Sequence, residues 1–169
     1  MNLKFRIPLY IIILASAIFL QGCYTFSGAS LSPDLKTISI AYFQNRASLV
    51  QPTLSQTFTE KLKDKFLSQT RLTLTNGEAD LTFEGYISEY NTQPITIQGN
   101  ETAAQNRLSI TVFVKFVNTK DSKLSFEAPF TRYFDYDSKL NLSTIEQEAI
   151  TEITRQLVDD IFNRAASNW

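Results

Sequence analysis

The sequence predicts an α+β fold of two layers, in which two helices pack on one face of a mainly antiparallel sheet of four to five strands. Two observations lead to this prediction. Two segments repeat apolar residues every four positions, which is typical of helices that bury one stripe. Several other segments alternate apolar and polar residues, which is the period of strands. Two helices with one apolar stripe each can cover one face of such a sheet.

The first strand is expected over residues 37–43, where apolar residues occupy both faces, as in a strand that is covered on both sides. A loop follows over residues 45–50. The first helix is expected from Pro52 to Ser68, because proline suits the first helical turn. Its apolar stripe consists of four residues spaced four apart, Leu54, Phe58, Leu62 and Phe66. We interpret this stripe as core rather than as a ligand site.

Two further strands are expected after this helix. Residues 71–75 predict a short strand, and Asn76-Gly77 supplies a turn. A longer strand is expected over residues 81–90, with a continuation at residues 95–97 beyond a proline. Gly85 within it indicates either a bulge or the close approach of another backbone segment.

The longest alternation in the chain lies at residues 108–117, after a polar loop expected over residues 98–105. One face is fully apolar and consists of Leu108, Ile110, Val112, Val114 and Phe116. The other face mixes polar residues with Phe113 and Val117, and we expect Tyr86 or Tyr90 beside them. Such a face is either solvated or a docking surface.

The last strand is expected over residues 124–136, where the alternation contains Pro129. A proline in a strand indicates an edge position or a bulge. A bulge would exchange the two faces, turning Arg132 outward and Tyr133 inward. The edge position leaves the faces as they are, so the register beyond the proline stays open between these two interpretations.

The second helix is expected over residues 144–165. Ser143 and Glu146 fit a capping box, in which each side chain accepts a hydrogen bond from the other residue's backbone N–H. The apolar stripe behind it repeats every four residues and consists of Ile145, Ala149, Ile153, Leu157 and Ile161.

The start of the chain has the features of an export signal. Lys4 and Arg6 precede a run of about 14 apolar residues, whereas a membrane-spanning helix needs roughly 20. The only cysteine of the chain, Cys23, follows Gly22 directly and resembles the lipidated cysteine of a bacterial lipobox, although Gln21 replaces the usual small residue. An ordinary signal peptide is the alternative. The organisation expected is a lipoprotein signal peptide (1–22), a lipidated tether (23–36) and a single α+β domain (37–169).

The amino-acid composition of the chain limits the catalytic and metal-binding chemistry that it can perform. The chain has no histidine, and lipidation would consume its one thiol, so the commonest general base and the usual zinc ligands are absent. No phosphate-binding glycine loop, dinucleotide fingerprint or nucleophile elbow occurs. With 16 basic and 17 acidic residues, there is no basic excess that would favour nucleic acid. We therefore expect neither an enzyme nor a cofactor or metal.

Several strings carry a resemblance to a known family. They are residues 22–30 (GCYTFSGAS), 37–40 (TISI), 52–56 (PTLSQ), 65–72 (KFLSQTRL) and 160–165 (DIFNRA) with Asn168-Trp169. Together they resemble the LptE-like lipopolysaccharide-assembly lipoproteins, in the form found in the Bacteroidetes. The resemblance implies an outer-membrane lipoprotein with two helices on a four-stranded sheet. It also implies a partner, the large LptD-like β-barrel translocon that inserts lipopolysaccharide into the outer leaflet and that such a lipoprotein plugs.

Five basic residues are candidates for contact with lipopolysaccharide, because its phosphates require cations. They are Lys65, Arg71, Arg107, Lys115 and Arg132. For each of them, a solvated surface position is the alternative. Two other functions stay open, namely an accessory lipoprotein of another envelope secretion or assembly machine and a lipid-anchored enzyme that uses carboxylates.

Overall fold

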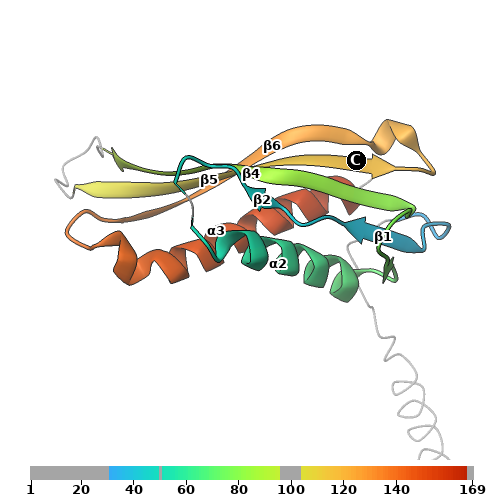
Figure 1. The fold of residues 1–169 in the computed structure, drawn as a ribbon, viewed down its shortest axis with the longest axis horizontal. Coiled ribbons are helices and arrows are strands. Elements are labelled where there is room, and N and C mark those ends of the chain that lie inside the picture. Colours follow the sequence, from blue (N-terminus) through green and yellow to red (C-terminus); the bar gives the residue numbers. More distant parts are fainter. Residues whose placement is uncertain (1–30, 50, 96–103, 167–169) are drawn as a thin grey trace, which may run out of the picture.

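The computed structural model describes residues 31–49, 51–95 and 104–166. They form a mixed sheet with two long helices on one of its faces (Figure 1). This confirms the predicted two-layer α+β fold, with a sheet of six strands rather than four or five. The signal peptide expected over residues 1–22, the lipidation site expected at Cys23 and the first part of the expected tether lie outside the described residues.

The sheet consists of a long antiparallel meander with short parallel strands at one side. Its strands are β1 (Thr37–Ile40), β2 (Gln44–Asn45), β3 (Thr73–Leu74), β4 (Leu81–Ile95), β5 (Gln105–Asn118) and β6 (Phe126–Asp137). β4, β5 and β6 are antiparallel, whereas β1 and β2 pair parallel with β4, and β3 pairs parallel with β1. A short 3-10 turn, η2 (Ser122–Leu124), precedes β6. Of the loop expected over residues 98–105, only the last two residues are described, and Gln105 already belongs to β5.

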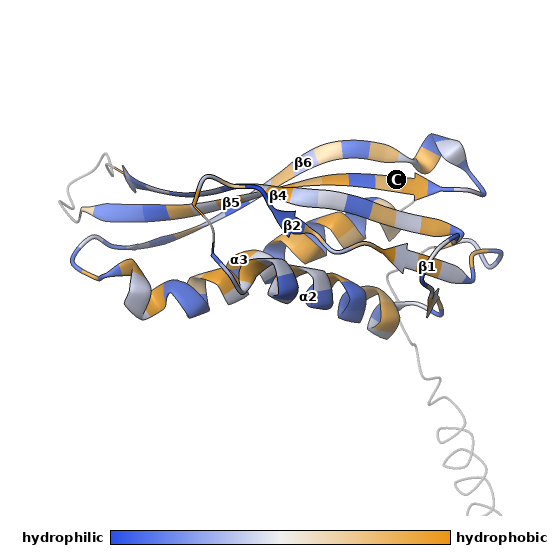
Figure 2. Ribbon diagram, in the orientation of Figure 1, coloured by the Kyte–Doolittle hydropathy of each residue, from blue (hydrophilic) through white to orange (hydrophobic). Residues whose placement is uncertain are grey.

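The helices α2 (Leu54–Gln69) and α3 (Leu142–Ala166) lie side by side beneath the sheet, and α3 packs against β5 and β6 (Figure 1). All four residues of the predicted α2 stripe are at most 1% exposed. The apolar face of β5 is equally buried and meets the helices across one hydrophobic core. In Figure 2, hydrophobic and hydrophilic residues alternate along the strand ribbons, as expected for strands with one buried face.

The expected strand over residues 37–43 is shorter than predicted, because β1 ends at Ile40. The additional strand is β2, at Gln44–Asn45, beyond the expected strand and at the start of the expected loop. The ladder with β4 is interrupted between Ile40 and Gln44, where Phe43 turns into the core and is fully buried. Its backbone N–H donates to Thr59 Oγ1 of α2 at 3.1 Å, and its ring meets Phe58 edge-on with centroids 5.1 Å apart. The buried Thr59 hydroxyl thus satisfies a backbone donor that leaves the ladder.

The structure distinguishes the two interpretations of Gly85. The register of β4 against β5 is continuous at Gly85 and shifts only between Ile87 and Glu89, so the bulge lies three residues later. A Cβ at Gly85 would clash with the carbonyl oxygen of Phe113, so the glycine permits a close backbone approach. The bulge exchanges the faces of β4, and Tyr90 consequently faces the core and is 5% exposed.

Pro129 marks an edge strand and not a bulge. β6 ends the sheet, and its pairing with β5 runs without a register shift from Gln105↔Asp137 to Phe116↔Phe126. The faces are therefore not exchanged. Arg132 lies opposite Ile110 on the helix side, and Tyr133 points outward, so a bulge at the proline, with the exchange of these two residues, is excluded.

The cap of the second helix differs from the prediction. α3 begins at Leu142, and Asn141 Oδ1 accepts a hydrogen bond from the Ser143 backbone N–H at 3.1 Å. Asparagine is as good an N-cap as serine. Glu146 does not reach back to Ser143, because its carboxylate accepts the hydrogen bond donated by the Tyr90 hydroxyl.

Candidate partner-binding surface

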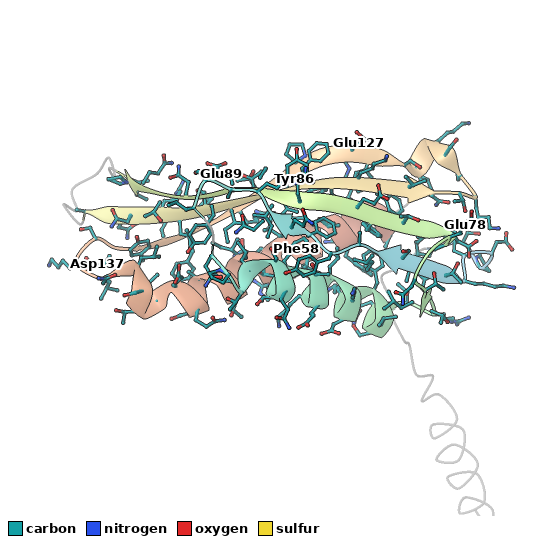
Figure 3. The ribbon with its side chains drawn as sticks, viewed as in Figure 1. Phe58, Glu78, Tyr86, Glu89, Glu127 and Asp137 are labelled. Carbon is teal, nitrogen blue, oxygen red and sulfur yellow. The ribbon has the colours of Figure 1, made fainter. Side chains whose placement is uncertain are left out.

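The sheet has an outer face, defined as the side of β4, β5 and β6 that points away from the two helices. In Figure 3, Phe58 lies between the sheet and α2, whereas Glu127 lies on the opposite side of the sheet. No described helix or strand covers this face. It divides into two regions along the strands, one polar and one aromatic.

The polar region lies toward the end of the molecule at which β4 ends and β5 begins. Thr111 links Glu89 and Thr131 across three strands, through hydrogen bonds of 3.0 and 2.9 Å. Farther along, Arg107 donates two hydrogen bonds to Asp135, at 2.7 and 2.8 Å. The polar groups of this region therefore have partners within the sheet.

The Arg107 pair also carries an aromatic contact. The guanidinium carbon lies 3.6 Å from the ring centroid of Tyr133, and the hydrogen bonds that Arg107 donates to Asp135 raise the pKa of Arg107. Bidentate pairing and stacking hold the guanidinium in one orientation. A phosphate at Arg107 would have to share the guanidinium with Asp135 or displace that carboxylate.

The aromatic region consists of a row across three strands. Tyr86 and Phe113 are cross-strand partners whose rings stack with centroids 5.5 Å apart, and Pro129 of β6 lies on the other side of Phe113. Arg46, just after β2, places its guanidinium 4.6 Å from the Tyr86 centroid. Tyr42 lies nearby and is 57% exposed. We call these five residues the aromatic–guanidinium patch.

A shallow depression of about 390 Å³ adjoins this patch. Lys115 lies at its edge, 4.0 Å from a Glu84 oxygen and 3.9 Å from a Glu127 oxygen. All three side chains are about half exposed, so these ion pairs contribute little to stability. Lys115 and Arg107 share one face of β5 but lie eight residues apart, which is about 27 Å along a strand.

The other three candidate cations lie elsewhere. Lys65 joins the helices, with its amino group 2.7 Å from Asp159 of α3. Arg132 reaches from the edge strand to Asp160 of α3 and donates two hydrogen bonds to it. Arg71 follows α2 and lines a cavity of about 510 Å³ beside the N-terminal end of the described chain. The structure thus does not bring the five predicted cations together.

Comparison with known proteins identifies the family. The model of the LptE family, described as lipopolysaccharide-assembly, matches residues 35–165, which is more than half of the chain. The chain belongs to the LptE family. The family's process is the assembly of lipopolysaccharide, and this is the coarse functional assignment of the chain.

Solved structures support the fold of this LptE-family chain. A minor lipoprotein from Acinetobacter baumannii is similar with a TM-score of 0.53 and 16% identity, covering 79% of this chain and 94% of that one. A hypothetical protein from Chlamydia trachomatis is similar with a TM-score of 0.52 and 11% identity, covering 79% and 99%. Identities this low show a shared fold only. No curated protein sequence matches the chain significantly.

Two kinds of feature are not found in the described ranges of the LptE-family chain. No group of three or more potential ligands is arranged to hold a metal ion there. None of the helices in that part of the chain is long and apolar enough to cross a membrane.

One carboxyl group with a strongly lowered pKa belongs to a structural residue. Asp80, before β4, accepts hydrogen bonds from the backbone N–H groups of Lys36 and Thr37 at 2.8 and 3.0 Å. These bonds lower the pKa of Asp80 from 3.8 to about 2. Asp80 thereby ties the start of β1 to the start of β4, which is a role in folding rather than in binding.

Sequence reasoning missed Arg46 and Tyr42 as members of a surface. Arg46 falls in the segment expected to be a loop, and Tyr42 in a strand expected to be covered on both sides. Their place beside Tyr86 depends on the parallel pairing of β2 with β4, which puts Gln44 opposite Tyr86. No local pattern encodes that pairing, so no signal in the sequence could have identified them.

Proposed function

We propose that this chain is an outer-membrane lipoprotein that acts as a non-enzymatic plug and assembly factor of the β-barrel translocon for lipopolysaccharide. The match of the LptE family model over residues 35–165 is the observation that carries the proposal. The resemblance of residues 22–30 to the start of such lipoproteins supports it. Enzymatic activity is not part of the proposal, since the chain has no histidine and Cys23 is assigned to lipid.

The position of the N-terminal end of the described chain suits a short lipid anchor. Leu31, the first described residue, lies beside Ala165 and Ala166, so both ends of the described chain meet at one end of the molecule. Leu31 lies eight positions after Cys23, and an extended chain spans at most about 28 Å over eight such steps. Lipid on Cys23 would hold this end near the membrane surface. The end labelled by Asp137 in Figure 3 would then lie farther from it.

The five candidate cations differ in their availability for lipopolysaccharide phosphates. Lys65, Arg107 and Arg132 already make close ion pairs, and Lys115 lies between two carboxylates. Arg71 has no carboxylate within ion-pairing distance among the described residues. We therefore propose Arg71 as the first of the five to test for contact with phosphate, because a phosphate there need not displace a carboxylate.

Affinity purification of the tagged full-length protein from gently solubilised outer membranes tests the function. The expected result is co-isolation of a large β-barrel of the lipopolysaccharide-transport type. Isolation of a secretin or an export channel instead would favour the accessory lipoprotein of another machine. Recovery of the lipoprotein without any barrel would refute the proposed function.

Lipidation is tested separately. Replacing Cys23 with alanine should abolish the incorporation of a labelled fatty acid, because the thiol is the proposed attachment point. Continued labelling of Cys23→Ala would show that the lipobox is assigned wrongly.

A further inference from the structure

We propose that the aromatic–guanidinium patch is a docking site for an apolar segment of the partner barrel that carries a carboxylate opposite Arg46. The inference rests on the proposed function, since it names the surface through which this chain holds its barrel. The patch lies on the outer face of the sheet, which no described helix or strand covers.

The composition of the patch is that of an interface centre. Tyrosine, phenylalanine and arginine are enriched in the buried centres of protein interfaces and among the residues that dominate binding energy. Tyr42 is 57% exposed, a high value for so large a side chain. A monomeric domain gains nothing from this exposure, whereas burial against a partner removes it from water.

The patch is preorganised. Tyr86 and Phe113 are held on paired strands, and their rings are inclined by only 26°. Arg46 stacks over Tyr86, and its backbone N–H donates to the Ile87 carbonyl at 2.9 Å. Fixed side chains lose little conformational entropy on binding, so more of the contact energy appears as affinity. The adjoining depression is shallow, and this shape fits a protein segment better than an enclosed small molecule.

The charges in and around the patch indicate which kind of side chain the partner presents to it. Arg107, on the same face, is already paired with the carboxylate of Asp135. Lys115 likewise lies between the carboxylates of Glu84 and Glu127. Arg46 has no carboxylate within ion-pairing distance in the described part of the chain. A guanidinium stacked on an aromatic ring keeps its in-plane donors available for a bidentate carboxylate. The geometry therefore calls for an acidic side chain in the partner.

The first test compares two arginines of matched environment. Arg164 on α3 also stacks on an aromatic ring, 4.2 Å from the Phe126 centroid, and also lacks a carboxylate partner among the described residues. The full-length variants Arg46→Glu and Arg164→Glu are purified from outer membranes, and the barrel recovered per lipoprotein is quantified. Arg46→Glu should lower recovery by about tenfold or more, as for a dominant interface residue, and Arg164→Glu should not. Equal recovery with both variants would overturn the inference.

A photo-crosslink identifies the occupant. A benzophenone side chain at Tyr42 should crosslink in intact cells to a barrel peptide that contains aspartate or glutamate. The same group at Tyr133, an outer-face tyrosine that is 50% exposed, is the control and should give a weaker crosslink or a different peptide. A crosslink from Tyr42 to lipopolysaccharide or to a second copy of the lipoprotein would overturn the inference and leave the proposed function standing. Failure of the wild-type protein to recover any barrel would instead refute the proposed function.

Discussion

The two faces of β5 differ in what determines which residues occupy them. On the helix side, every second residue from Leu108 to Phe116 is apolar and at most 1% exposed. On the outer side, Arg107, Thr111 and Phe113 follow one another without an apolar pattern, and each contacts side chains of neighbouring strands. The helix side meets the general requirement to bury apolar surface. The outer side carries specific contacts, and its aromatic region is the part that suits a partner.

The largest effect is expected on the helix side. Phe116→Ala should lower the free energy of unfolding by about 3–5 kcal/mol, because the ring is 1% exposed and packs against Phe83 at 4.7 Å between centroids. Urea unfolding followed by circular dichroism measures the change. A midpoint like that of the wild-type protein would mean that this face is not the core.

A second effect tests how closely the strands approach. Gly85→Ala should cost about 1–3 kcal/mol, since the added Cβ meets the Phe113 backbone carbonyl and the ring of Phe43. Thr82→Ala, on the outer face of the same strand, serves as the control and should change stability much less. The same unfolding assay applies, and an equal effect of the two substitutions would contradict the close approach.

The third prediction concerns pH. The folded-state pKa of Asp80 is about 2, below its ordinary value of 3.8. Its hydrogen bonds with Lys36 and Thr37 therefore contribute stability that is fully present above about pH 4 and is lost as the pH falls through 2. Asp80→Asn should be less stable than wild type at pH 6, and the difference should narrow toward pH 2. A difference that stays constant with pH would show that the carboxylate charge is not responsible.

The smallest effect is expected in the polar region of the outer face. Arg107→Ala should lower the free energy of unfolding only slightly, because the Arg107–Asp135 pair is partly exposed at 29% for both side chains. High salt should reduce the difference from wild type. A loss of several kcal/mol in thermal or urea unfolding would mean that the outer face contributes to the fold as strongly as the core.

These differences explain what the sequence could predict. The helix stripes and the apolar face of β5 follow periodic burial, and a period is visible in a single chain. The break after Ile40 and the bulge at Ser88 depend on contacts between distant segments, such as Thr59 with the Phe43 backbone. The sequence left Tyr86 and Tyr90 as alternatives for the outer face, and that bulge decides between them. Arg46 joins the patch only through the parallel pairing of β2 with β4.

The most direct test uses Phe113, the outward neighbour of the helix-side series on β5. Phe113→Ala is measured for both its free energy of unfolding and its recovery of the barrel from solubilised outer membranes. We expect a stability loss of about 1 kcal/mol, the value of one surface aromatic pair, together with a marked loss of barrel. A loss of stability as large as that of Phe116→Ala, or undiminished recovery of the barrel, would contradict the division of the sheet into a folding face and a partner face.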